Sequence, residues 1–283
     1  MAIHIGCGSW ADAKYVGVLY PRGLPANARL RTYAQWFDRI ELNNTYHNTP
    51  TPKAVADWAA QTPPGFIFDF KLHRSFSQSP AKAAAAGDEI ERLHAAARPL
   101  LHAKKLGAFL LTLPPSFGPE RHRLDELDGL IGKIPSRPLA VELRHRAWVE
   151  GKALASTLDY FRRHKLVWVA VDLPQLDAPN LLPPVDEVTN PDLAYLRLHG
   201  RNPDYLKGES AAEKHHYDYT ARDLDEIVGR IKVLAAGAKD VHVSVNNHAE
   251  KFAPQAALAL RRLLGQRVTG VELATQTTLF RDK

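Results

Sequence analysis

Cysteine is almost absent from this chain of 283 residues, which contains only Cys7. One cysteine cannot form an intramolecular disulfide, and we expect it to be a small buried residue rather than a nucleophile. The chain also lacks any run of about 18 apolar residues and any basic segment followed by an apolar one at its start. These absences predict a cytoplasmic protein that does not enter a membrane.

Several motifs with well-understood chemistry are missing as well. No GxGxxG follows the first apolar segment, which argues against a dinucleotide-binding fold. No GxSxG is present for a nucleophilic serine, and no HxH or HExxH for a metal. An active site in this chain therefore has to be assembled from residues that are far apart in the sequence.

Charge is present in ordinary amounts, with charged residues at 24% and hydrophobic residues at 45%. The net charge of +6 suits a phosphorylated ligand or nucleic acid. The basic residues are spread along the chain rather than gathered in one strongly basic segment. The charge thus permits nucleic acid as an alternative partner without selecting it.

Eight apolar segments alternate with segments of helical spacing, which predicts an α/β protein with a parallel sheet. This number of units favours a TIM-type (β/α)8 barrel. Five prolines make 173–192 an irregular connection. No linker divides the chain, so we predict a single barrel domain, 1–283, with a C-terminal extension at 265–283 and a small strand at 268–273. The predicted strands are 3–8, 39–43, 66–71, 106–113, 139–143, 166–172, 193–198 and 241–245, and the helices are 30–37, 52–61, 81–103, 124–134, 154–164, 222–236 and 254–264.

Polar side chains follow six of the predicted strands. In a TIM barrel the carboxyl ends of the strands and the loops after them meet at one site. Along the second strand, Glu41, Asn43 and Thr45 alternate, which predicts that all three point to one face. The alternative is that some of these groups form buried ion pairs, such as Asp172 with Arg197. The full set is Glu41, Asn43, Thr45, Lys71, Glu142, Arg144, His145, Asp172, Arg197, His199, Asn246, Asn247 and His248.

The residue types suggest acid–base chemistry on an anion. Glu41 and Glu142 are the predicted acid–base pair, and His199 is the predicted proton shuttle. Lys71 is a further catalytic candidate, either as a Schiff-base lysine or, in the ordinary case, as the partner of a glutamate. Together with Arg144 and Arg197 it also forms a predicted anion clamp. The remaining predicted substrate-binding residues are Asn43, Thr45, Trp10, His145, Asp172, Asn246 and Asn247.

We predict no cofactor. Carboxylates and histidines among these residues make a divalent metal an alternative, which the three nearby cations oppose. The favoured function is an enzyme, of hydrolase, lyase or isomerase type, that acts on a small polar anionic compound resembling a sugar or sugar phosphate. The alternatives are a protein that binds or processes nucleic acid and a non-catalytic binder of a small ligand. The sequence leaves the substrate and the oligomeric state open.

A series of short motifs occurs in a fixed order along the chain: Ile5-Gly6, Trp10, Tyr20-Pro21, Glu41-Leu-Asn-Asn-Thr-Tyr46, Pro63-Pro-Gly-Phe66, Lys71, Leu113-Pro-Pro-Ser-Phe117, Val141-Glu-Leu-Arg-His145, Trp148, Tyr195-Leu-Arg-Leu-His-Gly200 and Asn246-Asn247. This series closely resembles the DUF72 (YecE-like) family. The resemblance covers residues 3 to about 264 and implies a TIM-barrel-like fold without an established activity. It also implies that the family's polar strand-end pattern falls on Glu41, Asn43, Lys71, Glu142, Arg144, Asp172, Arg197, His199 and Asn247.

Overall fold

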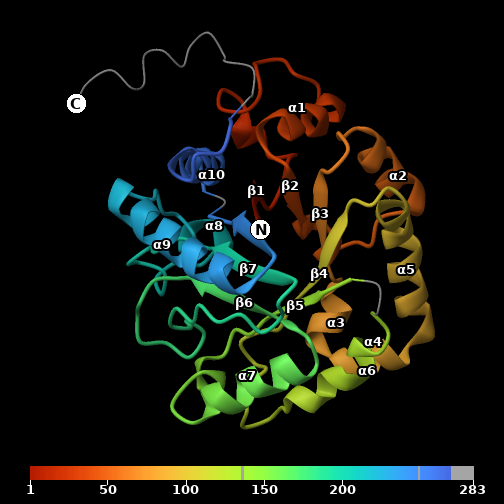
Figure 1. The fold of residues 1–283 in the computed structure, drawn as a ribbon, viewed down its shortest axis with the longest axis vertical. Helices are drawn as coiled ribbons and strands as arrows, with labels where there is room; N and C mark the ends of the chain where they lie inside the picture. The colour runs from red at the N-terminus through yellow and green to blue at the C-terminus, as the bar shows by residue number, and fades with distance from the viewer. Residues whose placement is uncertain (135–136, 248, 269–283) are drawn as a thin grey trace.

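Eight parallel strands form the centre of the protein, and helices surround them (Figure 1). The computed structural model describes residues 1–134, 137–247 and 249–268. The predicted TIM-type barrel is confirmed: each strand pairs in parallel with the next, in the order β1-β8-β7-β6-β5-β4-β3-β2. The strands are β1 (Ala2–Cys7), β2 (Arg39–Leu42), β3 (Ile67–Lys71), β4 (Leu106–Thr112), β5 (Leu139–Glu142), β6 (Val167–Asp172), β7 (Leu193–Leu198) and β8 (Asp240–Val245).

The predicted helices are present, two of them in altered form, and short α-helices at Arg74–Gln78 and Ala211–Lys214 are additional to the prediction. The helix predicted at 81–103 is divided into α4 and α5 at Ala86, and Pro99 lies inside α5 without ending it. The helix predicted at 124–134 is a 3-10 helix followed by one short α-helix. The α-helices are α1 (Arg29–Trp36), α2 (Pro52–Ala60), α3 (Arg74–Gln78), α4 (Pro80–Ala85), α5 (Gly87–His102), α6 (Asp128–Ile131), α7 (Ala153–Arg163), α8 (Ala211–Lys214), α9 (Ala221–Gly237) and α10 (Phe252–Leu263), and the 3-10 helices are η1 (Ala13–Tyr15), η2 (Ala26–Ala28), η3 (Asn43–Tyr46), η4 (Leu124–Leu127) and η5 (Arg146–Trp148).

The connection between β6 and β7 is irregular, as predicted, and contains no helix. Hydrogen bonds from side chains, rather than regular backbone pairing, hold this connection in place. The Trp168 indole donates to the Val185 carbonyl, and the Thr189 hydroxyl donates to the Leu166 carbonyl. The small strand predicted at 268–273 lies, beyond residue 268, outside the described residues, as does most of the C-terminal extension.

A tyrosine side chain completes the barrel between β1 and β2, the two edge strands of the sheet. The Tyr33 hydroxyl, from α1, accepts from the Cys7 amide at 2.7 Å and donates to the Arg39 carbonyl at 3.1 Å. Gly6 permits this approach, because a Cβ there would lie 2.0 Å from the Arg39 oxygen. The neighbouring Cys7 thiol is fully buried, and burial raises its pKa to about 12, which confirms the predicted packing role.

The barrel interior is unusually polar for an architecture whose centre is normally filled by branched apolar side chains. Arg39 donates from Nε to Asp69 at 2.7 Å, and His242 contacts the same carboxylate through Nδ1 at 2.9 Å. Arg39 also donates to the Tyr195 hydroxyl. All four side chains are buried, so their hydrogen bonds offset the cost of removing them from water.

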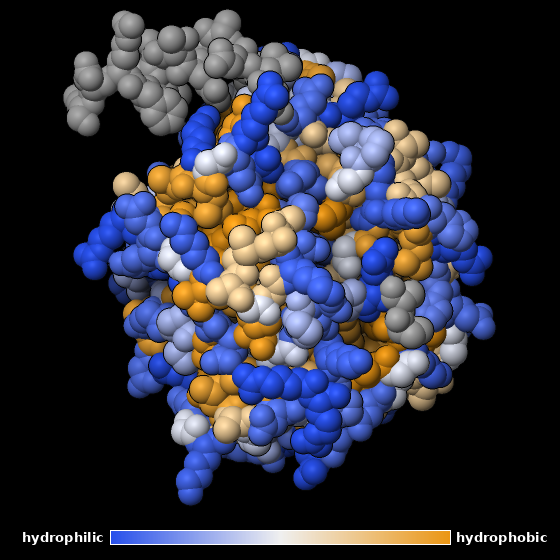
Figure 2. Space-filling view, in the orientation of Figure 1, coloured by the Kyte–Doolittle hydropathy of each residue, from blue (hydrophilic) through white to orange (hydrophobic). Residues whose placement is uncertain are grey.

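The outer surface carries mainly polar residues, with an apolar strip beside α9 and α10 (Figure 2). The groove there has a volume of about 650 Å³ and is lined in part by Leu224, Leu258 and Leu263. No helix among the described residues is both long and apolar enough to cross a membrane.

Candidate functional site

Arg197 joins the two glutamates that the sequence predicts as an acid–base pair. It donates to Glu41 from Nε at 3.1 Å and from Nη2 at 2.7 Å. Its Nη1 donates to Oε2 of Glu142. Glu41 is on β2, Glu142 on β5 and Arg197 on β7, and each side chain is at most 2% exposed. The strand ends therefore do converge, but around a shared guanidinium.

Both carboxylates are held in the charged form. Burial alone would raise the pKa of Glu41, but Arg197, with help from Arg39 and Lys71, lowers it to about 2. For Glu142 the penalty of burial is likewise outweighed by Arg144 and Arg197, so its pKa lies well below the ordinary value. Two permanently charged carboxylates are poor proton donors at neutral pH.

Lys71, at the end of β3, has the opposite properties. Burial, reinforced by the charges of Arg197 and Arg144, lowers the pKa of Lys71 to about 7. Its Nζ lies 4.7 Å from the centre of the Tyr46 ring and makes no hydrogen bond or ion pair with any described residue. Lys71 thus makes no direct ion pair with a glutamate among the described residues, although the charges of Glu41 and Glu142 act on it and oppose the shift. Lys71 is instead an amine that changes charge near neutral pH.

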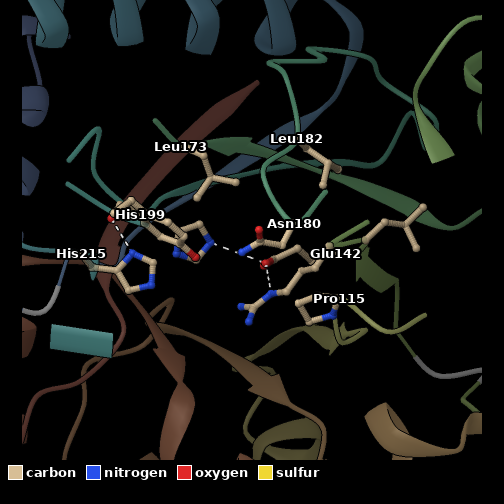
Figure 3. Close-up of a pocket in the computed structure, with 10 residues that line it drawn as sticks. Pro115, Glu142, Leu173, Asn180, Leu182, His199 and His215 are labelled. Carbon is tan, nitrogen blue, oxygen red and sulfur yellow. Dashed lines mark hydrogen bonds and ion pairs between the residues drawn. The ribbon is translucent and has the colours of Figure 1, made fainter. Parts of the chain in front are cut away.

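A small cavity of about 50 Å³ lies beside Glu142. Figure 3 shows the Glu142 carboxylate and the His199 ring directed toward one another, with His215 beyond His199 and Asn180 close to both. Arg144 donates from Nε to Glu142 at 2.6 Å, and its side chain is 38% exposed. We call this space the Glu142 cavity. It is lined by Pro115, Glu142, Leu143, Arg144, Leu173, Asn180, Leu182, His199, Tyr205 and His215.

His199 contributes an unsatisfied nitrogen to the Glu142 cavity. Its Nε2 is buried without a hydrogen-bond partner among the described residues. Oε1 of Glu142 is 3.6 Å from this nitrogen, which is too long for a hydrogen bond. Burial lowers the pKa of His199 below its ordinary value although Glu142 opposes the shift. The imidazole is therefore neutral at pH 7 and lacks a partner that a ligand in the cavity can provide.

A second, larger cavity adjoins Glu41. It has a volume of about 300 Å³ and includes the side chain of Trp10 from the loop after β1. Asn43 and Asn44 of η3 form another part of its wall. We call this space the Trp10 cavity. It is lined by Gly8, Ser9, Trp10, Ala11, Glu41, Asn43, Asn44 and His47.

Comparison with known proteins places this fold and these residues in a family. The family model described as "Protein of unknown function DUF72" matches residues 4–279. The chain belongs to the DUF72 family. The UPF0759 protein YunF of Bacillus subtilis (strain 168) is 24% identical to it over 255 residues, which cover 87% of this chain and 89% of YunF.

Two solved DUF72 structures have the same fold. A DUF72 protein from Enterococcus faecalis V583 is 26% identical, with a TM-score of 0.84 over 94% of this chain and 96% of the other. A DUF72 protein from Thermotoga maritima MSB8 is 27% identical, with a TM-score of 0.80 over 94% of this chain and 100% of the other. These likenesses confirm the predicted family and fold.

Asp172 does not face the site of this DUF72 chain. Val171 is the register partner of Arg197 on β7, so the next residue, Asp172, points to the other face of the sheet. There it accepts hydrogen bonds from Arg201, from Arg230 of α9 and from the Tyr219 hydroxyl. The alternative pair with Arg197 is therefore wrong, and Asp172 lines neither the Glu142 cavity nor the Trp10 cavity.

The predicted alternation of Glu41, Asn43 and Thr45 also fails, because β2 ends at Leu42 and η3 follows. Thr45 turns back into the protein, with its hydroxyl 2.6 Å from the Leu42 carbonyl oxygen and 2.5 Å from that of Lys71. It therefore links the end of β2 to the end of β3.

Two other predicted residues have local structural roles. His145 accepts from the Ala147 amide at the start of η5 and packs against Gly118, where a Cβ would lie 2.8 Å from the imidazole. Asn247 donates to the Tyr217 carbonyl at 2.7 Å, although its Oδ1 is buried without a partner among the described residues. Neither lines the Glu142 cavity or the Trp10 cavity.

Asn43 and Asn246 stay close to the site. Asn43 donates to Oδ1 of Asn246 at 2.9 Å, and its own Oδ1 lies 3.5 Å from Nη2 of Arg197. The pair therefore links the ends of β2 and β8 beside the Trp10 cavity. His248, which follows β8, lies outside the described residues.

The described residues contain no group of three or more His, Cys, Asp or Glu side chains arranged to hold a metal ion. Each site carboxylate is instead occupied by a guanidinium. The described residues therefore offer no ready ligand set for the divalent metal considered as an alternative.

Sequence reasoning missed two groups of residues. Arg39, Asp69, Tyr195 and His242 each lie two positions before a polar residue on the same strand, so strand alternation was a usable signal for them. Asn180, Tyr205 and His215 come from loops without periodicity, and the sequence held no comparable signal. The same is true of Ser9, Asn44 and His47 in the Trp10 cavity.

Proposed function

We propose that this DUF72 protein is an enzyme that binds a small polar anionic compound, of the sugar or sugar phosphate type, and transforms it by proton transfer. The observation that carries the proposal is the state of Lys71. It is an amine with a pKa of about 7, and it has no hydrogen bond or ion pair with the described residues around it.

The charges at the site favour an anion. Glu41 and Glu142 are balanced by Arg197 and Arg144 through direct ion pairs. When Lys71 is protonated, its positive charge has no direct ion-pair partner among the described residues. An anionic group that approaches Lys71 and the partly exposed Arg144 supplies such a partner, and Arg adds planar two-point recognition.

Lys71 is also the group best suited to move a proton. A general acid or base is most effective when its pKa lies near the working pH, and Lys71 meets this condition. Neutral His199, with its free Nε2 in the Glu142 cavity, is the second proton carrier. Glu41 and Glu142 then position Arg197 instead of acting as acid and base.

The test compares wild-type protein with Lys71→Arg in incubations with a panel of sugar phosphates, followed by mass spectrometry and NMR of the products. Arginine keeps the positive charge but does not release a proton at neutral pH, so the variant should bind anions and form no product. Thermal unfolding of both proteins serves as the control for folding. Compounds recovered unchanged from the wild-type protein would instead indicate a non-catalytic binder, and full turnover by Lys71→Arg would contradict the role of Lys71.

A further inference from the structure

The two cavities share one ion-pair cluster. Glu142 lines the smaller cavity, Glu41 lines the larger one, and the Arg197 guanidinium joins the two carboxylates. A compound that contacts the residues around this cluster therefore has two different spaces available to it. Their sizes and side chains differ enough to assign different chemical groups to them.

The Glu142 cavity suits a compact charged group. At about 50 Å³ it has room for a few atoms and not for a ring. Its wall contains the Arg144 guanidinium and the buried, unpartnered Nε2 of His199, both of which can donate hydrogen bonds to an anion. The small space and these donors favour a phosphate or carboxylate group.

The Trp10 cavity suits a ring with hydroxyl groups. Its volume of about 300 Å³ lies at the lower end of the range of small-molecule pockets, which begins at roughly 300 Å³. The Trp10 indole supplies an aromatic surface, and it is held edge-on against Trp58 with a centroid distance of 5.2 Å. Aromatic surfaces pack well against the apolar faces of flat ligands, and a polar rim then fixes their orientation.

The polar rim of the Trp10 cavity includes a side-chain amide that is available to hydrogen-bond a ligand. Asn44 is exposed, and its side chain makes no hydrogen bond with another described residue. Amide groups both donate and accept, which matches the hydroxyl groups of a sugar. Asn43 beside it is held by Asn246, so its position is fixed before a ligand arrives.

We propose that the Trp10 cavity is the subsite for the sugar ring of a phosphorylated or carboxylated sugar whose anionic group occupies the Glu142 cavity. The inference rests on the proposed function, since it divides that substrate into a ring recognised by Trp10 and Asn44 and an anion recognised by Arg144 and His199.

The test measures the affinity of a panel of hexose and pentose phosphates, and of sulfate as the anion alone, by isothermal titration calorimetry. At least one sugar phosphate should bind tenfold or more tightly than sulfate. Asn44→Ala and Trp10→Phe should remove several-fold to tenfold of that advantage and leave the affinity for sulfate unchanged. Asn48→Ala is the matched control, because Asn48 is an exposed neighbour that does not line the cavity.

The outcomes separate this inference from the proposed function. Sulfate that binds with wild-type affinity to every variant, with no sugar phosphate binding more tightly than sulfate, overturns the ring subsite and retains the anion site. Equal weakening of sulfate and sugar phosphate by Asn44→Ala also overturns it. If sulfate and every sugar phosphate fail to bind at all, both proposals are overturned.

Discussion

Arg197 and Glu41 form a two-point ion pair inside the barrel, with Nε and Nη2 of the guanidinium donating to the two carboxylate oxygens at 3.1 and 2.7 Å. Neither side chain is more than 2% exposed. The third nitrogen of the same guanidinium donates to Glu142. One arginine therefore pairs with two buried carboxylates from different strands.

Replacing Arg197 by Met should strongly destabilise the protein. It leaves Glu41 and Glu142 buried without their shared partner, and breaking a buried ion pair in this way typically costs about 3–5 kcal/mol. Urea unfolding at pH 7 measures the change. The control is Arg222→Met on α9, whose arginine is 88% exposed and pairs with Glu226, so the expected loss is below about 1 kcal/mol. Equal losses of unfolding free energy for the two variants would show that the buried Arg197 ion pairs stabilise the protein no more than an exposed ion pair does.

Replacing Lys71 by Met should stabilise the protein, and more so in acid than in alkali. Below pH 7 Lys71 is protonated in both the folded and the unfolded chain. The buried positive charge then destabilises the folded protein by its full amount. Between pH 7 and the ordinary value of 10.5 the unfolded chain holds a proton that the folded chain has released, and wild-type stability rises with pH. The advantage of the variant should therefore be larger at pH 6 than at pH 9. The free energy of unfolding in urea at both values tests this, and a difference that is independent of pH would contradict the lowered pKa.

Replacing Tyr33 by Phe should weaken the closure of the barrel. The hydroxyl bonds to the Cys7 amide and the Arg39 carbonyl across the β1–β2 edge, and leaving such buried groups unpaired costs about 1–3 kcal/mol. Hydrogen exchange should speed up at the Cys7 amide in particular. Tyr160→Phe, which removes a hydroxyl bonded to the exposed Asp128 side chain, is the comparison variant and should lose less. Unchanged exchange at Cys7 would mean that other contacts close the barrel.

The fold was largely predictable, because each β/α unit has a local pattern. Apolar runs such as Leu106–Thr112 mark the strands, and the prolines of 173–192 exclude a helix there. The turn after Leu42 was not predictable in this way. Alternation predicts that Asn43 and Thr45 continue the strand, whereas the Thr45 hydroxyl contacts two backbone carbonyls in a 3-10 helix.

The candidate site was predictable in position and less so in chemistry. Strand ends converge in a barrel, so the sequence predicts that a set of strand-end side chains lies close together. That set is Glu41, Glu142, Lys71, Arg197 and His199. Which arginine or lysine pairs with which carboxylate depends on whether each side chain points into the barrel or away from it. The prediction assigned Asp172 to the inward face of β6, whereas it lies on the outward face. The same ion pairs complicate Glu142→Gln as a test of catalysis, since that change also disturbs Arg144 and Arg197. Lys71→Arg separates charge from proton transfer more cleanly.

The central claim is that an anion at this site is bound together with a proton on Lys71. Titration calorimetry with sulfate, whose own charge is constant between pH 7 and 9, tests it in two buffers with different ionisation enthalpies. At pH 8 the account predicts uptake of close to one proton per sulfate and an affinity that falls up to roughly tenfold per pH unit above 7. Lys71→Arg should bind sulfate without proton uptake. Sulfate binding to the wild-type protein with no proton uptake, or with an affinity that does not change with pH, would contradict the account.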